Sequence, residues 1–252
     1  MRVAALYDIH GMLDALDAVL AEVEQEDVDV VLLGGDVVGG PQPAEVLARL
    51  RGLDRELVWV RGNGDRALGP DGARAIAAGE EDAEPLLFTA ERLAAADREF
   101  LAELPATATF DVDGLGLTLF CHATPQNDLD LVTLATPDRF LLRAAEGIAE
   151  RTIVSGHTHM QFDRRVGNVR WINAGSVGMP YEGRVAAFWA LLGPGVELRH
   201  TPIDIERAAE AILASGWPPA TEFVDENVRA APSREEATDY FERLAAERGQ
   251  RD

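Results

Sequence analysis

The sequence predicts an α/β fold whose N-terminal part is a sheet of parallel strands joined by helices. Three apolar runs, at residues 2–7, 28–33 and 57–60, lack the alternation of a half-exposed strand and are therefore predicted to be buried strands. Between them, apolar residues recur at helical spacing over residues 12–26, and a shorter helix is expected over 44–50. Strands that alternate with helices over short connections predict parallel strands joined by right-handed crossovers.

Each of these three strands is followed directly by polar side chains of a kind that can bind metal ions. Asp8 and His10 follow the first strand, and Asp36 follows the second. Asn63 stands just after the third strand. In parallel sheets, functional sites gather at the carboxyl ends of the strands. We therefore expect these four side chains to lie at one edge of the sheet.

The middle of the chain predicts further helices and a hairpin. Residues 66–105 are rich in alanine and charged residues and are expected to be mostly helix or loop, with Thr89 as the N-cap of one helix. Two apolar runs at 107–112 and 115–121 are predicted strands, and the Asp-Gly pair between them is a hairpin signal. A loop follows, and then a helix that begins at Pro137, since proline suits the first helical turn.

The last third of the chain predicts strands first and helices afterwards. A short strand at residues 153–155 is followed by a Gly-His-Thr-His motif. Two hairpins are expected next, with strands at residues 161–166, 169–172, 184–192 and 196–201. We expect residues 1–202 to form the core domain and residues 203–252 to form a helical extension packed on it. Ser233 and Glu236 have the spacing of a capping box for the final helix.

Composition narrows the classes of partner and location. The chain has 252 residues and a formal net charge of −21, so neither a nucleic-acid backbone nor an anionic membrane is expected as its partner. No apolar run approaches the roughly 20 residues of a membrane span. The single cysteine, Cys121, excludes an intrachain disulfide and is expected to be a buried, unreactive side chain. With no signal peptide in evidence, a cytoplasmic location is expected.

The histidines suggest one metal centre assembled from distant segments. Four of the five histidines follow predicted strands, and histidine is the commonest side-chain metal ligand at neutral pH. Imidazole and carboxylate donors suit first-row divalent metals such as manganese, iron, cobalt or zinc, and Asp36 could bridge two of them. We expect two divalent ions, manganese first, with iron, zinc, cobalt or nickel as alternatives. The candidate ligands are Asp8, His10, Asp36, Asn63, His122, His157 and His159.

Each of these residues alone also has a purely structural explanation. Asp8 could be the N-cap of the next helix, and Asp36 could belong to a turn. Asn63, between two glycines, could serve to adopt a left-handed backbone, and His122 could be a hydrogen-bonded core histidine. The pair of histidines two positions apart is harder to explain by structure alone. The whole set, in this order and at these strand ends, favours a metal site.

These motifs, taken together, resemble the calcineurin-like metallophosphoesterases, and in particular their small prokaryotic YfcE-like phosphodiesterase branch. The resemblance covers about residues 1–200 and implies a four-layer α/β/β/α sandwich with two mixed sheets inside. The matching motifs are Asp8-Ile9-His10, Gly35-Asp36, Gly62-Asn63-Gly64-Asp65, His122, Gly156-His157-Thr158-His159 and Asn173-Ala174-Gly175-Ser176. The ligand sets it implies are Asp8, His10, Asp36 and His159 for one metal, and Asp36, Asn63, His122 and His157 for the other.

The resemblance implies a dinuclear phosphoesterase that hydrolyses a small phosphodiester by attack of a metal-bridging hydroxide. Two alternatives stay open. One is a phosphomonoesterase or nucleoside-polyphosphate hydrolase, and the other is a scaffold that keeps the fold without catalysis. The residues expected to take part in catalysis are Asp36, Asn63, Asp65 and His122.

One position departs from the resemblance. Many members carry a histidine after the asparagine, where it stabilises the transition state or protonates the leaving group, and here that position is Gly64. Asp65 is expected to orient a ligand such as His122. Substrate contacts are expected from Asn63, Arg66 and Asn127. The oligomeric state is left open.

Overall fold

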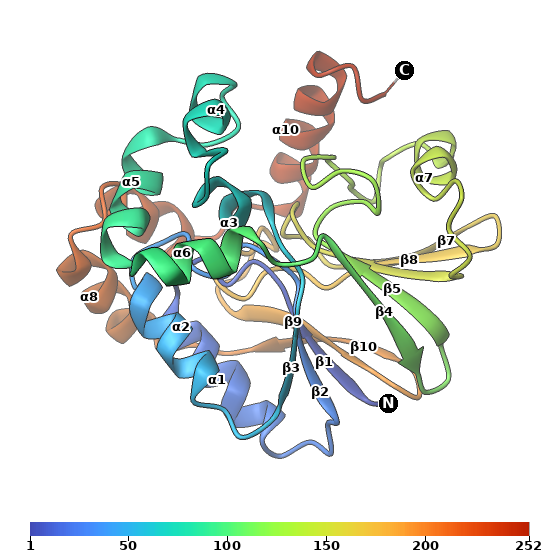
Figure 1. Ribbon diagram of the computed structural model, residues 1–252, viewed down its shortest axis with the longest axis horizontal. Coiled ribbons are helices and arrows are strands. Elements are labelled where there is room, and N and C mark those ends of the chain that lie inside the picture. The colour runs from blue at the N-terminus through green and yellow to red at the C-terminus, as the bar shows by residue number, and fades with distance from the viewer. Residues whose placement is uncertain (252) are drawn as a thin grey trace.

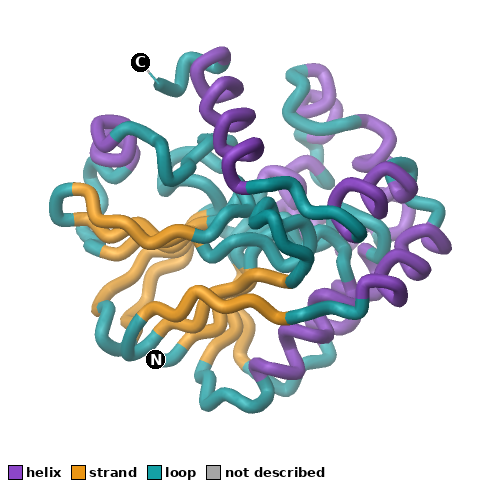
Figure 2. The backbone as a smooth tube through the Cα atoms, turned by 180° about the vertical axis from the view of Figure 1, so that it is seen from behind, coloured by secondary structure: helices purple, strands orange, loops and turns teal. Residues whose placement is uncertain are grey.

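The computed structural model describes residues 1–251 and shows two five-stranded sheets packed face to face, with helices on their outer faces (Figure 1). Figure 2 shows the strands gathered in two layers, with most of the helices on one side of them. This arrangement confirms the four-layer sandwich that the sequence resemblance implies.

The first sheet contains the three parallel strands predicted from the N-terminal part of the chain. Its order is β10-β9-β1-β2-β3, with β9 antiparallel to both β1 and β10. Its strands are β1 (Val3–Leu6), β2 (Val30–Leu33), β3 (Glu56–Trp59), β9 (Ala187–Leu192) and β10 (Val196–Thr201). Every residue of β1 and β2 is buried, which explains their continuous apolar sequence.

The second sheet is also mixed. Its order is β4-β5-β6-β8-β7, with parallel pairing between β5, β6 and β8 and antiparallel pairing at both edges. Its strands are β4 (Thr107–Val112), β5 (Gly116–Cys121), β6 (Thr152–Ser155), β7 (Phe162–Val166) and β8 (Val169–Asn173). The predicted hairpins β4–β5 and β7–β8 are therefore confirmed. The strands β5 and β6 pair in parallel, and a long connection that contains α7 joins them.

The helices cover both outer faces. They are α1 (Leu13–Val23), α2 (Pro43–Arg51), α3 (Asn63–Ala67), α4 (Gly72–Ala77), α5 (Ala83–Arg92), α6 (Ala95–Ala102), α7 (Asp138–Ala144), α8 (Ile205–Ser215), α9 (Ala220–Phe223) and α10 (Arg234–Glu247), with a π-helical turn at Val224–Val228. Among residues 1–251, none of these helices is long and apolar enough to cross a lipid bilayer.

Three buried clusters hold the layers together. Between the sheets lies an apolar layer that includes Tyr7, Phe120 and Ile172, and the Tyr7 hydroxyl donates to the carbonyl of Val154 at 3.0 Å. A second cluster joins the first sheet to α1, α2 and α8, and a third joins the second sheet to α7 around Trp171. The two sheets are thus bound to each other by apolar contact, and their strand ends form one common edge.

One helix boundary differs from the prediction. Thr89 is not an N-cap but lies buried inside α5, and its hydroxyl donates to the carbonyl of Pro85 at 3.1 Å. A threonine hydroxyl can satisfy a carbonyl four residues earlier, so a preferred capping residue is also tolerated inside a helix. The chain then breaks at Leu93, where the backbone is extended, and α6 begins separately. The capping box of Ser233 and Glu236 is confirmed.

Candidate metal centre

The seven candidate ligands converge where strands of both sheets end. Asp8 and His10 follow β1, Asp36 follows β2, and Asn63 is the first residue of α3 after β3. The ligands from the second sheet are His122 after β5 and the pair His157 and His159 after β6. All seven side chains lie at the carboxyl ends of strands, as expected, because both sheets have these ends at the same edge of the sandwich.

A first group of side chains surrounds one oxygen of Asp8. Asp8 Oδ1 lies 3.4 Å from His159 Nε2 and 3.8 Å from His10 Nε2. The two histidine Nε2 atoms are 3.2 Å apart. Asp8, His10 and His159 thus offer ligand atoms that all lie within 4.8 Å of one another.

A second group lies around His122. His122 Nε2 is 3.6 Å from Asp36 Oδ2, 3.1 Å from His157 Nδ1 and 3.1 Å from Asn63 Oδ1. The same nitrogen is 3.8 Å from Asp8 Oδ1, which joins the two groups. The histidines fall into the same two groups as in the division that the sequence resemblance implies, while Asp36 is grouped with His122 and His157 only.

Backbone carbonyls fix the protonation of three of the histidine rings. Nδ1 of His10 faces the carbonyl of Gly39 at 3.3 Å, Nδ1 of His122 that of Gly34 at 3.0 Å, and Nδ1 of His159 that of Met179 at 2.7 Å. A carbonyl can only accept a hydrogen bond, so each Nδ1 carries the proton and each Nε2 presents its lone pair to the centre. In this tautomer, Nε2 is free to bind a metal ion.

Unpartnered atoms show that these residues fit a pair of cations. Asp8 Oδ2 accepts the backbone N–H of His157 at 2.8 Å, but the buried Asp8 Oδ1 has no hydrogen-bond partner. A buried carboxylate oxygen without a partner costs free energy, as do two imidazole lone pairs that face each other at 3.2 Å. A divalent ion among these atoms would remove both costs, so the donor set fits the metal centre that the family resemblance implies.

The electrostatics favour the neutral form of His10 and His157 and the ionised form of Asp8. Burial, followed by the charge of nearby histidines, lowers the pKa of both His10 and His157. Burial would raise the pKa of Asp8, but the surrounding histidines, His159 foremost, bring that pKa well below its ordinary value. Neutral imidazoles and ionised carboxylates are the forms that bind metals.

The backbone at these residues is unusual as well. Within residues 1–251, positive φ angles occur outside glycine only at Asp8 (52°), His10 (48°), Asp36 (51°), His157 (67°) and His159 (58°). Such left-handed positions cost roughly 1–3 kcal/mol each when the residue is not glycine, and they cluster at functional sites. All five are candidate ligands, which supports a function for this edge that packing alone does not require.

Asp65 binds the backbone of the loop that carries the candidate ligand Asp36, whereas its hydrogen bonds do not include His122, the ligand that the sequence analysis named as an example. Its carboxylate accepts the backbone N–H groups of Asp36 at 2.8 Å, Val37 at 3.2 Å and Gly62 at 3.0 Å. His122 is oriented by a carbonyl at its Nδ1 instead. Asp65 therefore holds the loop that carries Asp36 against the start of α3.

Replacing Asp65 by asparagine is expected to lower the free energy of unfolding by about 1–3 kcal/mol, because the new amide group would face backbone donors that now have an acceptor. Urea denaturation of the metal-free protein measures this change. The exposed Asp239→Asn on α10 is the matched control and should alter stability by less than about 0.5 kcal/mol. Equal stability of the two variants would contradict the role given to Asp65.

A carboxyl group that the sequence did not reveal stands beside Asn63. Asn63 Nδ2 donates to Glu81 Oε1 at 2.7 Å, and Glu81 lines a cavity of about 80 Å³ together with Gly64 and Asp36. Burial, and then the charge of Asp36, raises the pKa of Glu81 to about 7. Glu81 lies in the connection between α4 and α5, so no strand-end pattern could have indicated it.

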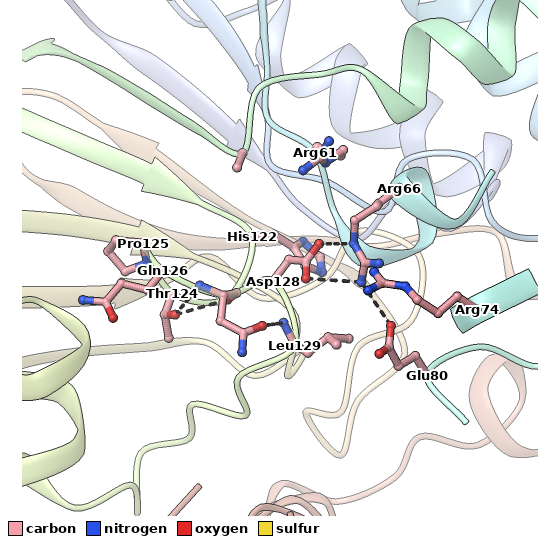
Figure 3. Close-up of a pocket in the computed structure, with 12 residues that line it drawn as sticks. Arg61, Arg66, Arg74, Glu80, His122, Thr124, Pro125, Gln126, Asp128 and Leu129 are labelled. Carbon is pink, nitrogen blue, oxygen red and sulfur yellow. Dashed lines mark hydrogen bonds and ion pairs between the residues drawn. The ribbon is translucent and has the colours of Figure 1, made fainter. Parts of the chain in front are cut away.

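The other predicted contact residues lie in a second cavity that opens at His122 (Figure 3). Its volume is about 330 Å³, and its walls include Arg66 and Asn127. Arg66 is paired with Asp128 at 2.8 Å and with Glu80 at 3.2 Å, whereas Asn127 Oδ1 accepts the N–H of the next residue but one. The structure therefore places both residues near the centre, with Arg66 already held by two carboxylates.

Aromatic rings connect the centre to the last helix. The ring of Tyr181 stacks on His159 with centroids 5.1 Å apart, and Phe241 of α10 packs on Tyr181 at 5.9 Å. The C-terminal helix is therefore linked to the candidate ligand His159 through Tyr181, which the sequence did not indicate.

Cys121 is buried, as expected, and burial raises the pKa of its thiol.

Known proteins are similar to this chain in sequence and in fold. A sequence profile of the calcineurin-like phosphoesterase superfamily domain matches residues 1–192. An uncharacterized protein of Methanocaldococcus jannaschii is 26% identical over 236 residues, covering 86% of this chain and 93% of that protein. The symmetrical bis(5'-nucleosyl)-tetraphosphatase of Nitrosococcus oceani is 31% identical over 172 residues, covering 66% of this chain but 58% of that enzyme. The crystal structure of a metallophosphoesterase from Sphaerobacter thermophilus has a TM-score of 0.71 at 23% identity, covering 89% of this chain and 98% of that chain, and therefore has the same fold.

Proposed function

Since the chain belongs to the calcineurin-like phosphoesterase superfamily, we propose that it is a metal-dependent phosphoesterase that hydrolyses a small phosphodiester with two divalent ions, manganese in the first place. We include in the proposal a cytoplasmic location, for which the lack of any possible disulfide is the support.

The observation that carries the proposal is the convergence of imidazole nitrogens on the carboxylate of Asp8. His10, His122 and His159 all direct Nε2 inward, and Asp8 Oδ1 lies within 3.8 Å of all three nitrogens. Nothing in the packing of the sheets requires these groups to face one another. Their buried position excludes bulk water, which strengthens charge interactions within the site.

Each ligand group would serve one part of the reaction. Asp8, His10 and His159 would hold one ion, and Asp36 would be shared with a second ion held by His122 and His157. Two such ions would supply the positive charge that binds a phosphoryl group and would lower the pKa of a water that attacks phosphorus in line. The amide of Asn63 now donates to Glu81, and in the proposed reaction it would donate to a phosphate oxygen instead.

Gly64 leaves this chain without a proton donor at a position where many members have a histidine. The leaving group should therefore matter more than usual, because general acid catalysis contributes roughly 10²–10⁴-fold. Activated aryl esters, whose leaving groups need no proton, should be the best model substrates.

A second candidate function is the hydrolysis of a nucleoside polyphosphate. The similarity to the tetraphosphatase of Nitrosococcus oceani favours it, and the basic cavity beside His122 offers room for further phosphates. The third reading, a scaffold without catalysis, has less support because the full set of candidate ligands is present and grouped.

The test is hydrolysis by the manganese-loaded protein, with the metal content of the same sample measured by mass spectrometry. We expect about two ions per chain and faster turnover of bis(p-nitrophenyl) phosphate than of p-nitrophenyl phosphate. A diadenosine polyphosphate in the same panel separates the second candidate. Two bound ions without hydrolysis of any of these esters would refute the enzyme and favour the scaffold.

A further inference from the structure

We propose that the cavity beside His122 is a binding site for a second phosphate group of the substrate, with Arg61 as the residue that selects it. The inference rests on the proposed function in one respect only, namely that the reacting phosphate binds at the metal centre. It adds a substrate class: phosphate esters that carry a further phosphate away from the ester being cleaved.

The charge of the cavity is opposite to that of the chain. The whole protein carries a formal net charge of −21, but three arginines, Arg61, Arg66 and Arg74, line this one cavity. Only two carboxylates, Glu80 and Asp128, stand among the lining residues. A surplus of cationic side chains in an acidic protein is expected where an anion must be attracted.

Arg61 is the side chain whose charge is least compensated. Its Nη1 donates to the carbonyl of Ala102 at 2.9 Å, but its buried Nε has no hydrogen-bond partner. No carboxylate of residues 1–251 lies within ion-pair distance of Arg61, whereas Arg66 and Arg74, which line the same cavity, each have at least one. The guanidinium charge of Arg61 is therefore balanced by no carboxylate, and an anion in the cavity that Arg61 lines would compensate it.

Arg66 shows the contrasting arrangement (Figure 3). In the figure, dashed lines join Arg66 to Asp128 and to Glu80, whereas none reaches Arg61. Arg66 is therefore fixed in place at the cavity wall with its charge largely balanced. The positive charge left for a ligand lies mainly on Arg61.

The backbone holds Arg61 in this position. Arg61 is the second residue after β3, two positions before Asn63, and its N–H donates to the carbonyl of Pro105 at 2.8 Å. One end of the segment therefore carries a candidate metal ligand and the other carries the uncompensated arginine. Only Gly62 separates Arg61 from Asn63 where the chain passes from β3 to α3, which keeps the two positions close together.

The cavity begins where the reaction would take place. His122 belongs both to the candidate metal centre and to the cavity wall. A substituent of a phosphate bound at His122 can thus enter the cavity, whose volume of about 330 Å³ is ample for one further phosphate and its linking atoms. Phosphate oxygens match the fork of donors of a guanidinium group, which explains why an arginine stands there.

The experiment compares ligands that differ in one phosphate. Thymidine 5'-monophosphate, thymidine 5'-diphosphate and thymidine 3',5'-bisphosphate are titrated by calorimetry into the full-length, manganese-loaded protein with manganese in excess. We expect at least one of the two doubly phosphorylated nucleotides to bind about 10-fold more tightly than the monophosphate. In Arg61→Gln this preference should fall to about one, and in Arg61→Lys, which keeps the charge but not the fork, it should be intermediate.

The control is Arg165→Gln, an equal loss of charge on the exposed face of β7, and it should keep the wild-type preference. A wild-type protein that binds all three nucleotides equally, or an Arg61→Gln variant that keeps the preference, would overturn the proposal. Because the measurement needs no turnover, a protein that shows the preference but cleaves no ester refutes the proposed function and supports the phosphate site. A protein that cleaves phosphodiesters but shows no preference for a second phosphate supports the proposed function and refutes the phosphate site.

Discussion

Replacing Asp36 by asparagine is expected to lower kcat/KM for bis(p-nitrophenyl) phosphate by about 10³-fold or more, the largest effect that we expect from a single substitution. Asp36 Oδ1 accepts the N–H of Gly64 at 2.8 Å, and an amide oxygen can still do so. The variant thus keeps the contact that shapes the loop and loses the negative charge. In the wild type, Asp36 Oδ2 faces His122 Nε2 at 3.6 Å. In the variant, the NH₂ group of asparagine would stand at this place, and it cannot bind a metal ion.

Two measurements on Asp36→Asn separate chemistry from folding. The metal content of the loaded variant should fall below that of the wild type, while its unfolding curve without metal should stay close to the wild-type curve. Asp27→Asn, an exposed position before β2, serves as the control for the change of charge. If Asp36→Asn hydrolysed the substrate at the wild-type rate, the carboxylate of Asp36 would not be needed for the reaction, and the proposed function would be wrong.

Replacing Gly156 by alanine should damage the first group of ligands without touching any of their side chains. A Cβ atom at this position would lie 2.4 Å from Asp8 Oδ2 and 2.6 Å from the ring of Tyr7, both of which are buried. Asp8 would have to leave the N–H of His157 to make room. We expect a loss of about 1–3 kcal/mol in the free energy of unfolding and a loss of at least 100-fold in kcat/KM.

The matched control for Gly156→Ala is Gly195→Ala. A Cβ atom at Gly195 meets no other atom within 4 Å, so stability and rate should both be almost unchanged. Denaturation in urea and steady-state kinetics on the same preparations give the two quantities. A Gly156→Ala protein with full activity would show that Asp8 is not needed in its present position, which would contradict the ligand assignment.

The sequence could predict the sheets and the ligands because both follow from local patterns. Buried runs such as residues 30–33 show no alternation, and the polar residue after each run must lie at the edge where parallel strands end. Apolar periodicity likewise predicted α1, whose buried residues have helical spacing. Local patterns thus carried the fold and the whole candidate ligand set.

Features made by contacts between distant loops could not be predicted in the same way. Glu81 reaches Asn63 from a connection between helices, and Asp65 binds backbone donors of a loop 29 residues earlier in the chain. The free charge of Arg61 depends on which carboxylates lie near it in space, and its sequence neighbours do not determine that. Left-handed backbone at non-glycine residues, as at His157, is imposed by the surrounding structure and leaves no mark on composition.

The origin of the ligands in two different sheets makes an ion at this edge a cross-link between the layers of the sandwich. The strands that supply the ligands are joined otherwise by the apolar layer between the sheets and by hydrogen bonds such as those of Tyr7 to Val154 and of His122 to Gly34. By mass action, an ion present at 100 times its dissociation constant stabilises the folded state by about 2.7 kcal/mol. Melting temperature therefore reports affinity, and thermal scans with each divalent cation would rank the metals before any substrate is known.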